Sequence, residues 1–235
     1  MKFFFVIISI AGSANFMIDI WFLGQACIKV KGKGATLVFD PYDSNFVGLK
    51  PLKTEADIVC VTHDHGDHNS VESVKGADGK SPFIISGPGE YEISGINIVG
   101  VDSFHDDEQG AKRGKNTIYH ATVDDVNLVH LGDLGQKKLT QSQIEELSGC
   151  DVLFIPVGGV YTIEAKDAPD IISQLEPSIV VPIHYKLPGL KVDLAEVSEF
   201  LKVMGKENVE PASKLSVSKD RLPEELEVAV LAAQQ

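Results

Sequence analysis

The chain of 235 residues is poor in basic residues and in long apolar runs. It has 21 lysines and arginines against 34 aspartates and glutamates, which gives a formal net charge of −13 at pH 7. Proteins that bind nucleic acids usually present a basic face that releases counterions from phosphates, so a long nucleic acid is not expected as a partner. No segment has the roughly 18 uninterrupted apolar residues that span a bilayer, so a membrane is not expected as a partner either.

Cysteine is also scarce, with three residues that are odd in number and far apart, at Cys27, Cys60 and Cys150. Such a set does not indicate a disulfide framework, and two of the three lie beside apolar residues typical of strands. We therefore expect buried free thiols in a reducing compartment, which predicts a cytoplasmic protein.

The first residues favour a different location. Lys2 and the apolar and small residues up to Ala14 resemble a short secretory signal with a cleavage region, which would make the protein exported. Against this, only one basic residue precedes the apolar run, and strand-forming residues follow Met17 directly. We therefore predict that residues 1–16 are a signal-like or mis-assigned extension and that 17–235 form a single domain.

Strands dominate the first half of the chain, and single helices alternate with strands in the second half. Apolar or alternating runs predict strands at 18–22, 27–30, 36–39, 58–61, 83–85, 91–93, 96–101, 117–123, 126–131, 152–156 and 179–183. Helices are predicted from 69 or 70 to about 74, and over 140–147, 168–175 and 193–204. Polar residues with metal-binding potential follow several strand ends. This order predicts two packed sheets with helices outside them.

The densest group of potential metal ligands directly follows the predicted buried strand 58–61. Residues 62–68 read Thr-His-Asp-His-Gly-Asp-His, which places three imidazoles and two carboxylates in seven positions. Imidazole binds zinc and its first-row neighbours, and carboxylates add the negative charge that lets a second cation sit nearby. The loop therefore predicts a metal site.

The geometry of this loop predicts the start of two sites. His63 and His65 are two positions apart on an extended segment, so their side chains can face the same side. Gly66 permits a bend, after which Asp67 and His68 must diverge and can serve a second metal. A catalytic zinc needs about three protein ligands and an open position, so further donors must come from elsewhere.

The further donors are few. His105, Asp133 and His184 each follow an apolar, strand-like run, which makes them candidates at strand ends. His120 and His130 lie within predicted strands, where a hydrogen-bonded structural histidine is the better interpretation. We therefore leave these two outside the predicted ligands.

The order and spacing of these residues resemble the motifs of the metallo-β-lactamase superfamily. The resemblance rests on His63-x-His65-x-Asp67-His68 followed by His105, Asp133 and His184, and it covers most of the chain from Ile18 onward. The sequence around 104–116 and 130–135 is similar to uncharacterised zinc-dependent hydrolases near the L-ascorbate-6-phosphate lactonase-like group. The resemblance implies a mixed α/β fold, an αββα sandwich with the metals in a cleft at one edge.

The resemblance also implies which residues bind which metal. His63, His65 and His105 would hold one ion, Asp67, His68 and His184 the other, and Asp133 would bridge both. The expected cofactors are two divalent ions, Zn2+ first and Mn2+ second. Gln25 and Gln136 stand where relatives of this branch often have a histidine, which leaves the contacts at these two positions open.

The charge of such a centre favours hydrolysis. Two zinc ions with Asp67, Asp133 and a bridging hydroxide would carry a formal charge of about +1, and coordination lowers the pKa of bound water toward roughly 7. We therefore predict a dinuclear metal-dependent hydrolase whose bridging hydroxide attacks a small anionic ester or lactone, with Asp67 and Asp133 as catalytic residues. Two alternatives stay open: a phosphodiesterase or nuclease-like hydrolase, and a metal-binding or regulatory module without turnover.

A basic island of Lys112, Arg113 and Lys115 stands out in this acidic chain. If its loop folds over the cleft, Arg113 can bind a carboxylate or phosphate bidentately and Asn116 can orient a substrate oxygen, so both are candidate substrate-binding residues. The alternative is a solvated hairpin without substrate contacts. The expected partner is thus a small anionic molecule, and self-association into a homo-oligomer stays open.

Overall fold

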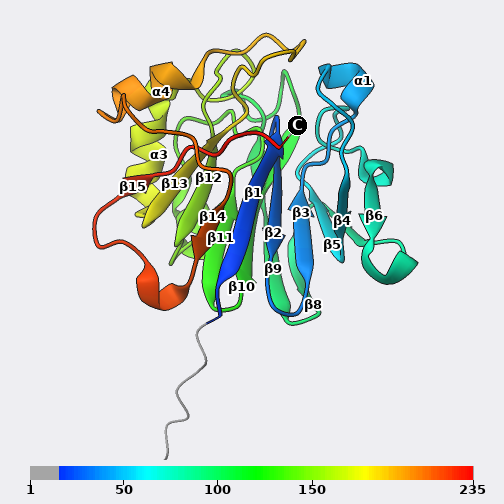
Figure 1. Ribbon diagram of the computed structural model, residues 1–235. Helices are drawn as coiled ribbons and strands as arrows, with labels where there is room; N and C mark the ends of the chain where they lie inside the picture. Colours follow the sequence, from blue (N-terminus) through cyan, green and yellow to red (C-terminus); the bar gives the residue numbers. More distant parts are fainter. Residues whose placement is uncertain (1–15, 235) are drawn as a thin grey trace, which may run out of the picture.

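A computed structural model describes residues 16–234 of the protein. Two large β-sheets face each other, with a small two-stranded sheet and short helices around them (Figure 1). The predicted N-terminal extension falls almost entirely on residues 1–15, which lie outside the described residues. None of the helices in the described range is long and apolar enough to cross a membrane.

The first large sheet has six strands, most of them from the early part of the chain. Their order is β14 (Leu215–Val217), β1 (Ile18–Gly24), β2 (Cys27–Lys31), β3 (Thr36–Phe39), β5 (Ile58–Val61) and β7 (Phe83–Ser86). β3, β5 and β7 run parallel, so their carboxyl ends lie at the same edge of the sheet. All the strands predicted for this sheet are confirmed, and β14 is an additional strand.

The second large sheet has seven strands. Their order is β15 (Glu227–Val228), β13 (Ile179–Ile183), β12 (Val152–Pro156), β11 (Val126–His130), β10 (Lys115–Val123), β9 (Ile96–Phe104) and β8 (Gly89–Ile93). β11, β12 and β13 are parallel, and β9 shares their direction because β9 and β11 are both antiparallel to β10. The strands that precede His105, Asp133 and His184 therefore end at one edge of this sheet.

One apolar core fills the space between the two sheets. Phe39 on β3 crosses this space to β12, where its ring centroid lies 6.4 Å from that of Phe154, and it stacks on His130 of β11 at 4.8 Å. All three cysteines are buried and free, as predicted. This packed core gives the loops at the sheet edge a rigid support.

The helices are short. They are α1 (Ser44–Val47), α2 (Gln141–Glu146), α3 (Ala168–Leu175) and α4 (Val197–Val203). In Figure 1, α3 and α4 stand to the left beside β12 and β13, and α1 lies at the upper right. α2 and α3 match the prediction, and Thr140 caps α2 in a capping box with Gln143. The predicted mixed α/β sandwich is confirmed.

The helix predicted directly after the histidine loop is wrong. A 3₁₀ turn occupies Val71–Ser73, and the strand β6 (Val74–Gly76) follows at once and pairs in parallel with β4 (Thr54–Ala56). The β-branched valines and the available partner strand favour extended backbone here. The outer layer on this side therefore contains a small sheet where a helix was expected.

The last predicted helix begins later than expected. The prediction covers 193–204, whereas α4 begins at Val197. The N–H of Ala195 donates to the Gly158 carbonyl (2.8 Å), and the Ala195 carbonyl accepts from Lys186 N (2.9 Å). Because these bonds lie outside a helical pattern, they hold the preceding residues in a loop.

Candidate metal centre

The histidine loop leaves the six-stranded sheet at the end of β5 and turns at once. β5 is buried along its whole length, which fixes the point where His63 begins the loop. The N–H groups of His68 and Asn69 both donate to the His65 carbonyl, at 2.9 and 3.0 Å, and close the turn. His63, Asp67 and His68 are buried, whereas His65 is exposed. The loop therefore has a buried and a solvent-facing part.

Three distant donors come from strand ends of the seven-stranded sheet. His105 follows β9, Asp133 follows β11 and His184 follows β13, and all three are buried. His184 has a left-handed backbone with φ 51°, and its N–H donates to the Gln25 carbonyl at 2.7 Å. This bond holds a conformation that residues other than glycine rarely adopt, so the imidazole has a fixed direction.

These side chains form two groups, and within each group the potential ligand atoms all lie within 4.8 Å of one another. The three-residue set consists of His63, His65 and His105, and the four-residue set consists of Asp67, His68, Asp133 and His184. The structure thus brings all the predicted metal ligands together in two groups, with Asp133, which was predicted to be shared, in the four-residue set. That they bind metal stays a prediction.

Asp133, a member of the four-residue set, also approaches the three-residue set. Its Oδ2 atom is 3.3 Å from Nε2 of both His68 and His105, and 3.9 Å from Nε2 of His63. Its Oδ1 atom is 3.4 Å from Nε2 of His184. One carboxylate therefore reaches donor atoms of both sets, which is the arrangement required of a bridging ligand.

The donor atoms fit a cation between them. Within the described residues, Nε2 of His63, His68 and His184 and Oδ1 of Asp133 are buried without a hydrogen-bond partner. A buried polar atom left without a partner costs roughly 1–3 kcal/mol, so several that converge indicate a shared ligand. Imidazole and carboxylate are donors that divalent first-row metals accept. The residues present therefore fit divalent metal ions.

Burial and mutual contacts set the charge of this centre. Burial lowers the pKa of His63 to about 3 and also lowers that of His105, so both imidazoles are neutral and keep a lone pair for a metal. Burial opposes the charged form of His68 too, but the carboxylates of Asp133 and Asp67 outweigh it and raise the pKa of His68. Metal binding to the four-residue set would therefore displace a proton.

Asp40, which the sequence did not indicate, orients one imidazole of each set. Its buried carboxylate accepts from Thr62 N (2.8 Å) and Thr62 Oγ1 (2.8 Å) and from His68 Nδ1 (2.9 Å). The Thr62 hydroxyl in turn lies 2.9 Å from His63 Nδ1 and can accept its proton. Both imidazoles are thereby held with Nε2 facing the other donors, as is typical of ligating histidines.

Gln25 and Gln136 have different surroundings. Both stand at positions where the similar zinc-dependent hydrolases often have a histidine. Gln25 Nε2 donates to Asp67 Oδ2 at 2.8 Å, so Gln25 supports the four-residue set. Gln136 Oε1 accepts from Phe104 N at 3.3 Å, and its Nε2 donates to Gln143 Oε1 at 2.8 Å. Gln136 therefore fixes the end of β9 and does not contact the ligand sets.

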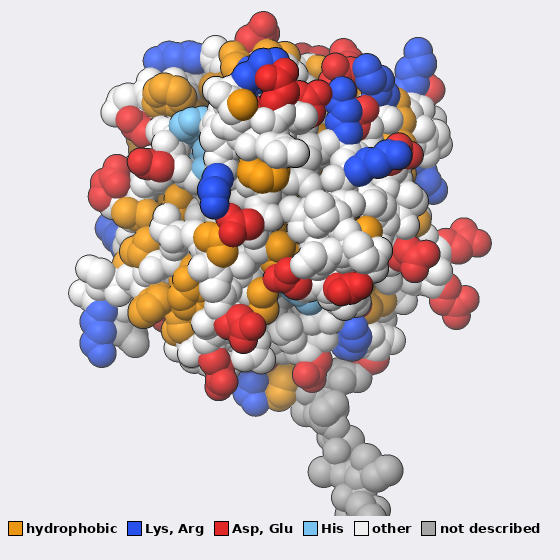
Figure 2. All heavy atoms as spheres, turned by 180° about the vertical axis from the view of Figure 1, so that it is seen from behind, with side chains coloured by type: hydrophobic (Ala, Val, Ile, Leu, Met, Phe, Trp, Pro, Cys, Tyr) orange, Lys and Arg blue, Asp and Glu red, His pale blue; other side chains and the backbone are white. Residues whose placement is uncertain are grey.

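The two sets face a cavity of about 790 Å³ that is open to solvent. Apolar and basic side chains share its wall with the metal-ligand candidates, among them Phe46, Tyr161, Val192, Lys112, Arg113 and Lys191. In the view from behind, histidine surface shows at the upper left, with hydrophobic and basic side chains nearby (Figure 2). A small molecule can therefore reach the donor atoms from outside.

Asp106 holds the basic loop at this cavity. Its carboxylate accepts hydrogen bonds of 2.7 to 2.9 Å from the N–H groups of Glu108, Gly110, Lys112 and Arg113. Although burial acts in the opposite direction, these bonds lower the pKa of Asp106 to about 2. Arg113 Nη2 donates to the Val160 carbonyl (3.3 Å), and its guanidinium carbon lies 5.3 Å from the Tyr161 ring centroid. The basic residues thus lie on a folded loop, with Lys112 and Arg113 at the cavity, and substrate contact by Arg113 stays a prediction.

The predicted substrate contact of Asn116 needs correction. Asn116 is 1% exposed, and it is absent from the cavity wall. Its Nδ2 donates to the Leu131 carbonyl (2.9 Å) and its Oδ1 accepts from Asp133 N (3.0 Å). Asn116 therefore supports the backbone that carries Asp133. Lys115 also lies elsewhere, because it is exposed and pairs with Asp102 at 3.2 Å.

The other two histidines lie outside both sets, as the sequence predicts. His130 Nε2 donates to the Ala26 carbonyl (2.9 Å), and its Nδ1 accepts from Gly132 N (3.1 Å). His120 Nδ1 lies 3.1 Å from the Glu146 carbonyl. These contacts with backbone groups identify both as structural histidines.

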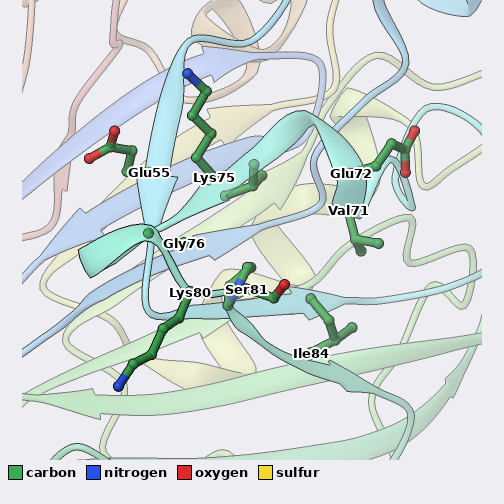
Figure 3. A pocket seen from close by; sticks show the side chains of 11 residues that line it. Glu55, Val71, Glu72, Lys75, Gly76, Lys80, Ser81 and Ile84 are labelled. Carbon is green, nitrogen blue, oxygen red and sulfur yellow. The ribbon is translucent and has the colours of Figure 1, made fainter.

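A second cavity, of about 650 Å³, lies against the small sheet of β4 and β6 (Figure 3). Glu55 and Lys75 are partners on the two strands, and Glu72 and Lys80 also line this cavity. No residue of either ligand set belongs to its wall. Among the described residues, the groups of potential metal ligands therefore lie at the cavity at the sheet edge and not at this second cavity.

Comparison with known proteins places this site in a family. A family model described as a beta-lactamase superfamily domain matches residues 19–184, which run from β1 to the last candidate ligand. The chain belongs to the metallo-β-lactamase superfamily. The membership confirms the fold that the histidine motif implied.

Individual members of the superfamily support the same conclusion. The chain is 29% identical over 212 residues to a UPF0173 metal-dependent hydrolase of Thermococcus onnurineus, covering 80% of this chain and 93% of the relative. A second relative of that name, from Thermococcus kodakarensis, is 30% identical over 195 residues, covering 72% of this chain and 85% of the relative. A solved structure from Thermotoga maritima, described as a candidate Zn-dependent hydrolase of the superfamily, is 34% identical with a TM-score of 0.73, covering 91% and 98% of the two chains.

Proposed function

We propose that the protein is a metal-dependent hydrolase with a dinuclear centre and that it cleaves a small anionic ester or lactone. The names of similar relatives support the hydrolase class. The single observation that carries the dinuclear centre is the position of Asp133, whose carboxylate lies within 4 Å of histidine Nε2 atoms from both sets.

The metals have a defined place in this proposal. His63, His65 and His105 would hold one divalent ion, Asp67, His68 and His184 the other, and Asp133 would be shared. When bound, zinc or manganese ions would supply hydroxide at neutral pH and an electrophile for a carbonyl oxygen. Asp67 and Asp133 limit the net positive charge of the centre, which leaves it attractive to an anionic transition state.

The protein itself would bind the substrate and move a proton. Arg113 lines the cavity and can bind a carboxylate or phosphate. Asp64 is exposed at the same cavity, where its carboxylate accepts a hydrogen bond from the Asn69 side chain. In this proposal Asp64 would carry a proton to the leaving group. His68 and His184 lower the pKa of Asp133 against the effect of burial, so Asp133 stays ionised and suits a ligand better than a proton donor.

A panel of chromogenic lactones, carboxylic esters, thioesters and phosphodiesters tests the proposal with the zinc and manganese forms of the protein. Turnover of esters or lactones that is lost in His65→Ala is the expected result. His65 is exposed, so its replacement should not disturb the fold. Two bound metals without turnover of any compound would contradict the proposal and support a metal-binding module.

Phosphodiesters are the second candidate substrates. Lys112 and Arg113 both line the cavity, and either can bind a phosphate as well as a carboxylate. Turnover of phosphodiesters without turnover of lactones or esters would establish this second candidate instead.

A further inference from the structure

Two large apolar side chains stand exposed at the mouth of the cavity. Phe46 is 56% exposed and Tyr161 is 38% exposed, and both line the 790 Å³ cavity that contains the ligand sets. Val192 lines the same wall and is partly buried. Exposed aromatic rings at the entrance of a cavity indicate a surface that a ligand covers.

Phe46 is held in place by the backbone around it. It belongs to α1, whose first turn is capped by the Asp43 side chain accepting from Asn45 N at 2.9 Å. Lys191 forms two hydrogen bonds with this helix. Its N–H donates to the Val47 carbonyl (2.8 Å), and its Nζ donates to the Asn45 carbonyl (2.9 Å). These hydrogen bonds therefore fix the backbone that carries the Phe46 ring at the cavity.

The ring lies directly over the bend of the histidine loop. A Cβ atom placed on Gly66 would be 3.5 Å from the Phe46 ring, so the ring packs against the glycine that separates His65 from Asp67. The Asp43 N–H also donates to the Gly66 carbonyl at 2.9 Å, which ties α1 to this bend. The apolar surface is thus adjacent to the reacting centre.

The same cavity offers one arginine without an acidic partner. Within the described residues, Arg113 forms no ion pair, and the one hydrogen bond of its side chain uses a single donor of the guanidinium, to the Val160 carbonyl. The Arg113 backbone N–H donates to the Asp106 carboxylate, and its guanidinium lies over the Tyr161 ring. Several N–H donors and the charge therefore remain for an anionic group of a ligand.

We propose, on the basis of the proposed hydrolase function, that the substrate is an amphiphilic ester. Its apolar acyl or aryl part covers Phe46 and Val192, and an anionic group on the other side of the scissile bond binds Arg113. Hydrolysis adds water across the acyl carbon–oxygen bond and yields a carboxylic acid and an alcohol. A wholly polar substrate would leave the Phe46 ring uncovered.

Esters of straight-chain acids from acetate to octanoate test the apolar part. They are made with 4-nitrophenol and with 3-hydroxy-4-nitrobenzoic acid, whose leaving group carries a carboxylate. With zinc-loaded protein, kcat/KM should rise about two- to fourfold per added CH2 until the apolar wall is covered. Phe46→Ala should lose at least half of this dependence, and Arg113→Ala should lose the preference for the charged leaving group.

Phe83→Ala is the matched control. Phe83 is 51% exposed on β7 and does not line the cavity, so its replacement removes a similarly exposed ring without touching the site. The control should keep the full dependence on chain length. Thermal midpoints of both variants show whether either substitution unfolds the protein.

Binding of alkyl phosphonates separates this inference from the proposed function. These compounds are not hydrolysed, and their dissociation constants can be measured by calorimetry for the same chain lengths. If no ester is turned over but phosphonate affinity rises with chain length and Phe46→Ala removes the rise, the hydrolase proposal fails and the amphiphile site stands. Equal dependence on chain length in the wild-type protein and Phe46→Ala, or none in the wild-type protein, would overturn the inference.

Discussion

The two ligand sets of the candidate centre differ in burial and in charge. The four-residue set is buried throughout and contains both carboxylates, whereas the three-residue set contains only imidazoles and includes the exposed His65. A cation in the four-residue set would be neutralised by Asp67 and Asp133 and shielded from water. A cation in the three-residue set would share only Asp133 and meet solvent. The structure therefore leads us to expect one firmly held metal and one exchangeable metal that is open to substrate.

The surrounding hydrogen bonds follow the same division. The Thr62 side chain contacts His63 of the three-residue set. Gln25 contacts the four-residue set, through its side chain to Asp67 and through its carbonyl to the N–H of His184. Asp40 is linked to both sets, directly to His68 and through Thr62 to His63. The two sets can therefore be perturbed separately or together.

Asp133→Asn should have the largest effect, because it removes the one charge that the two sets share. We expect metal content to fall from two equivalents to at most one. The loss of several kcal/mol of transition-state stabilisation corresponds to a decrease in kcat/KM of about 10³-fold or more. Elemental analysis and ester turnover measure both effects.

Asp125→Asn is the control for this change. Asp125 is exposed in the turn between β10 and β11 and has φ 67°, a conformation that asparagine tolerates. This variant should keep two equivalents of metal. Full metal content and activity in Asp133→Asn would show that the two sets are independent.

His184→Ala and His65→Ala remove one ligand from each set. Each variant should retain about one equivalent of zinc, because the other set remains complete. Dialysis against a chelator distinguishes them: His65→Ala keeps its metal in the buried set, whereas the metal left in His184→Ala is at the solvent-facing set and leaves quickly. If both variants lose their remaining zinc at the same rate, the proposed difference in metal exchange between the two sets is wrong.

Thr62→Val and Gln25→Leu should weaken one set each. Replacement of a group that orients a metal ligand typically costs about 10- to 100-fold in metal affinity, and we expect the lower end for both. Stepwise zinc titration of metal-free protein measures the affinity of each binding step. Thr62→Val should lower the affinity of the weaker step, which we assign to the three-residue set. Gln25→Leu should lower the affinity of the tighter step, which we assign to the four-residue set. The reverse assignment would contradict the contacts described for these two residues.

Asp106→Asn should have the smallest effect, and one that depends on pH. The pKa of Asp106 in the folded protein is about 2, below its ordinary value of 3.8, so its charge stabilises the fold above pH 4 and this stabilisation is lost as pH falls toward 2. The free energy of unfolding of metal-free Asp106→Asn should therefore lie below that of the wild-type protein at pH 7. Denaturant titrations should show the difference narrowing between pH 4 and pH 2.

The neighbouring residue provides the control for this pH dependence. Asp107 is exposed and forms an ion pair with Lys137, at 3.4 Å. An exposed pair of this kind contributes at most about 1 kcal/mol, so Asp107→Asn should remain close to the wild-type protein at every pH. A constant deficit of Asp106→Asn from pH 7 to pH 2 would show that its charge is not the cause.

The sequence was sufficient to name the candidate ligands, because they are rare residue types placed at strand ends. His105, Asp133 and His184 follow apolar runs that are all confirmed as strands, and the common direction of β9, β11 and β13 brings their ends together. The alternation of apolar and polar residues also located most of both sheets. Residue type and spacing therefore located the candidate donors, and the resemblance to the superfamily implied how they divide between two metals.

The supporting contacts could not be found in this way. Asp40 is 28 positions from His68, and Gln25 is 42 positions from Asp67, so both contacts depend on which strands pair and in which register. A single sequence does not determine that register. The direction of the Asn116 side chain could not be predicted either. Arg113, three positions earlier, lines the cavity, whereas the Asn116 side chain accepts a hydrogen bond from the backbone N–H of Asp133.

Anomalous diffraction at the zinc edge, from crystals of zinc-reconstituted protein, tests the dinuclear centre most directly. We predict two peaks, one among the imidazoles of His63, His65 and His105 and one among the four-residue set, with the Asp133 carboxylate between them. A single peak, or a second peak away from Asp133, would contradict a shared pair of metals.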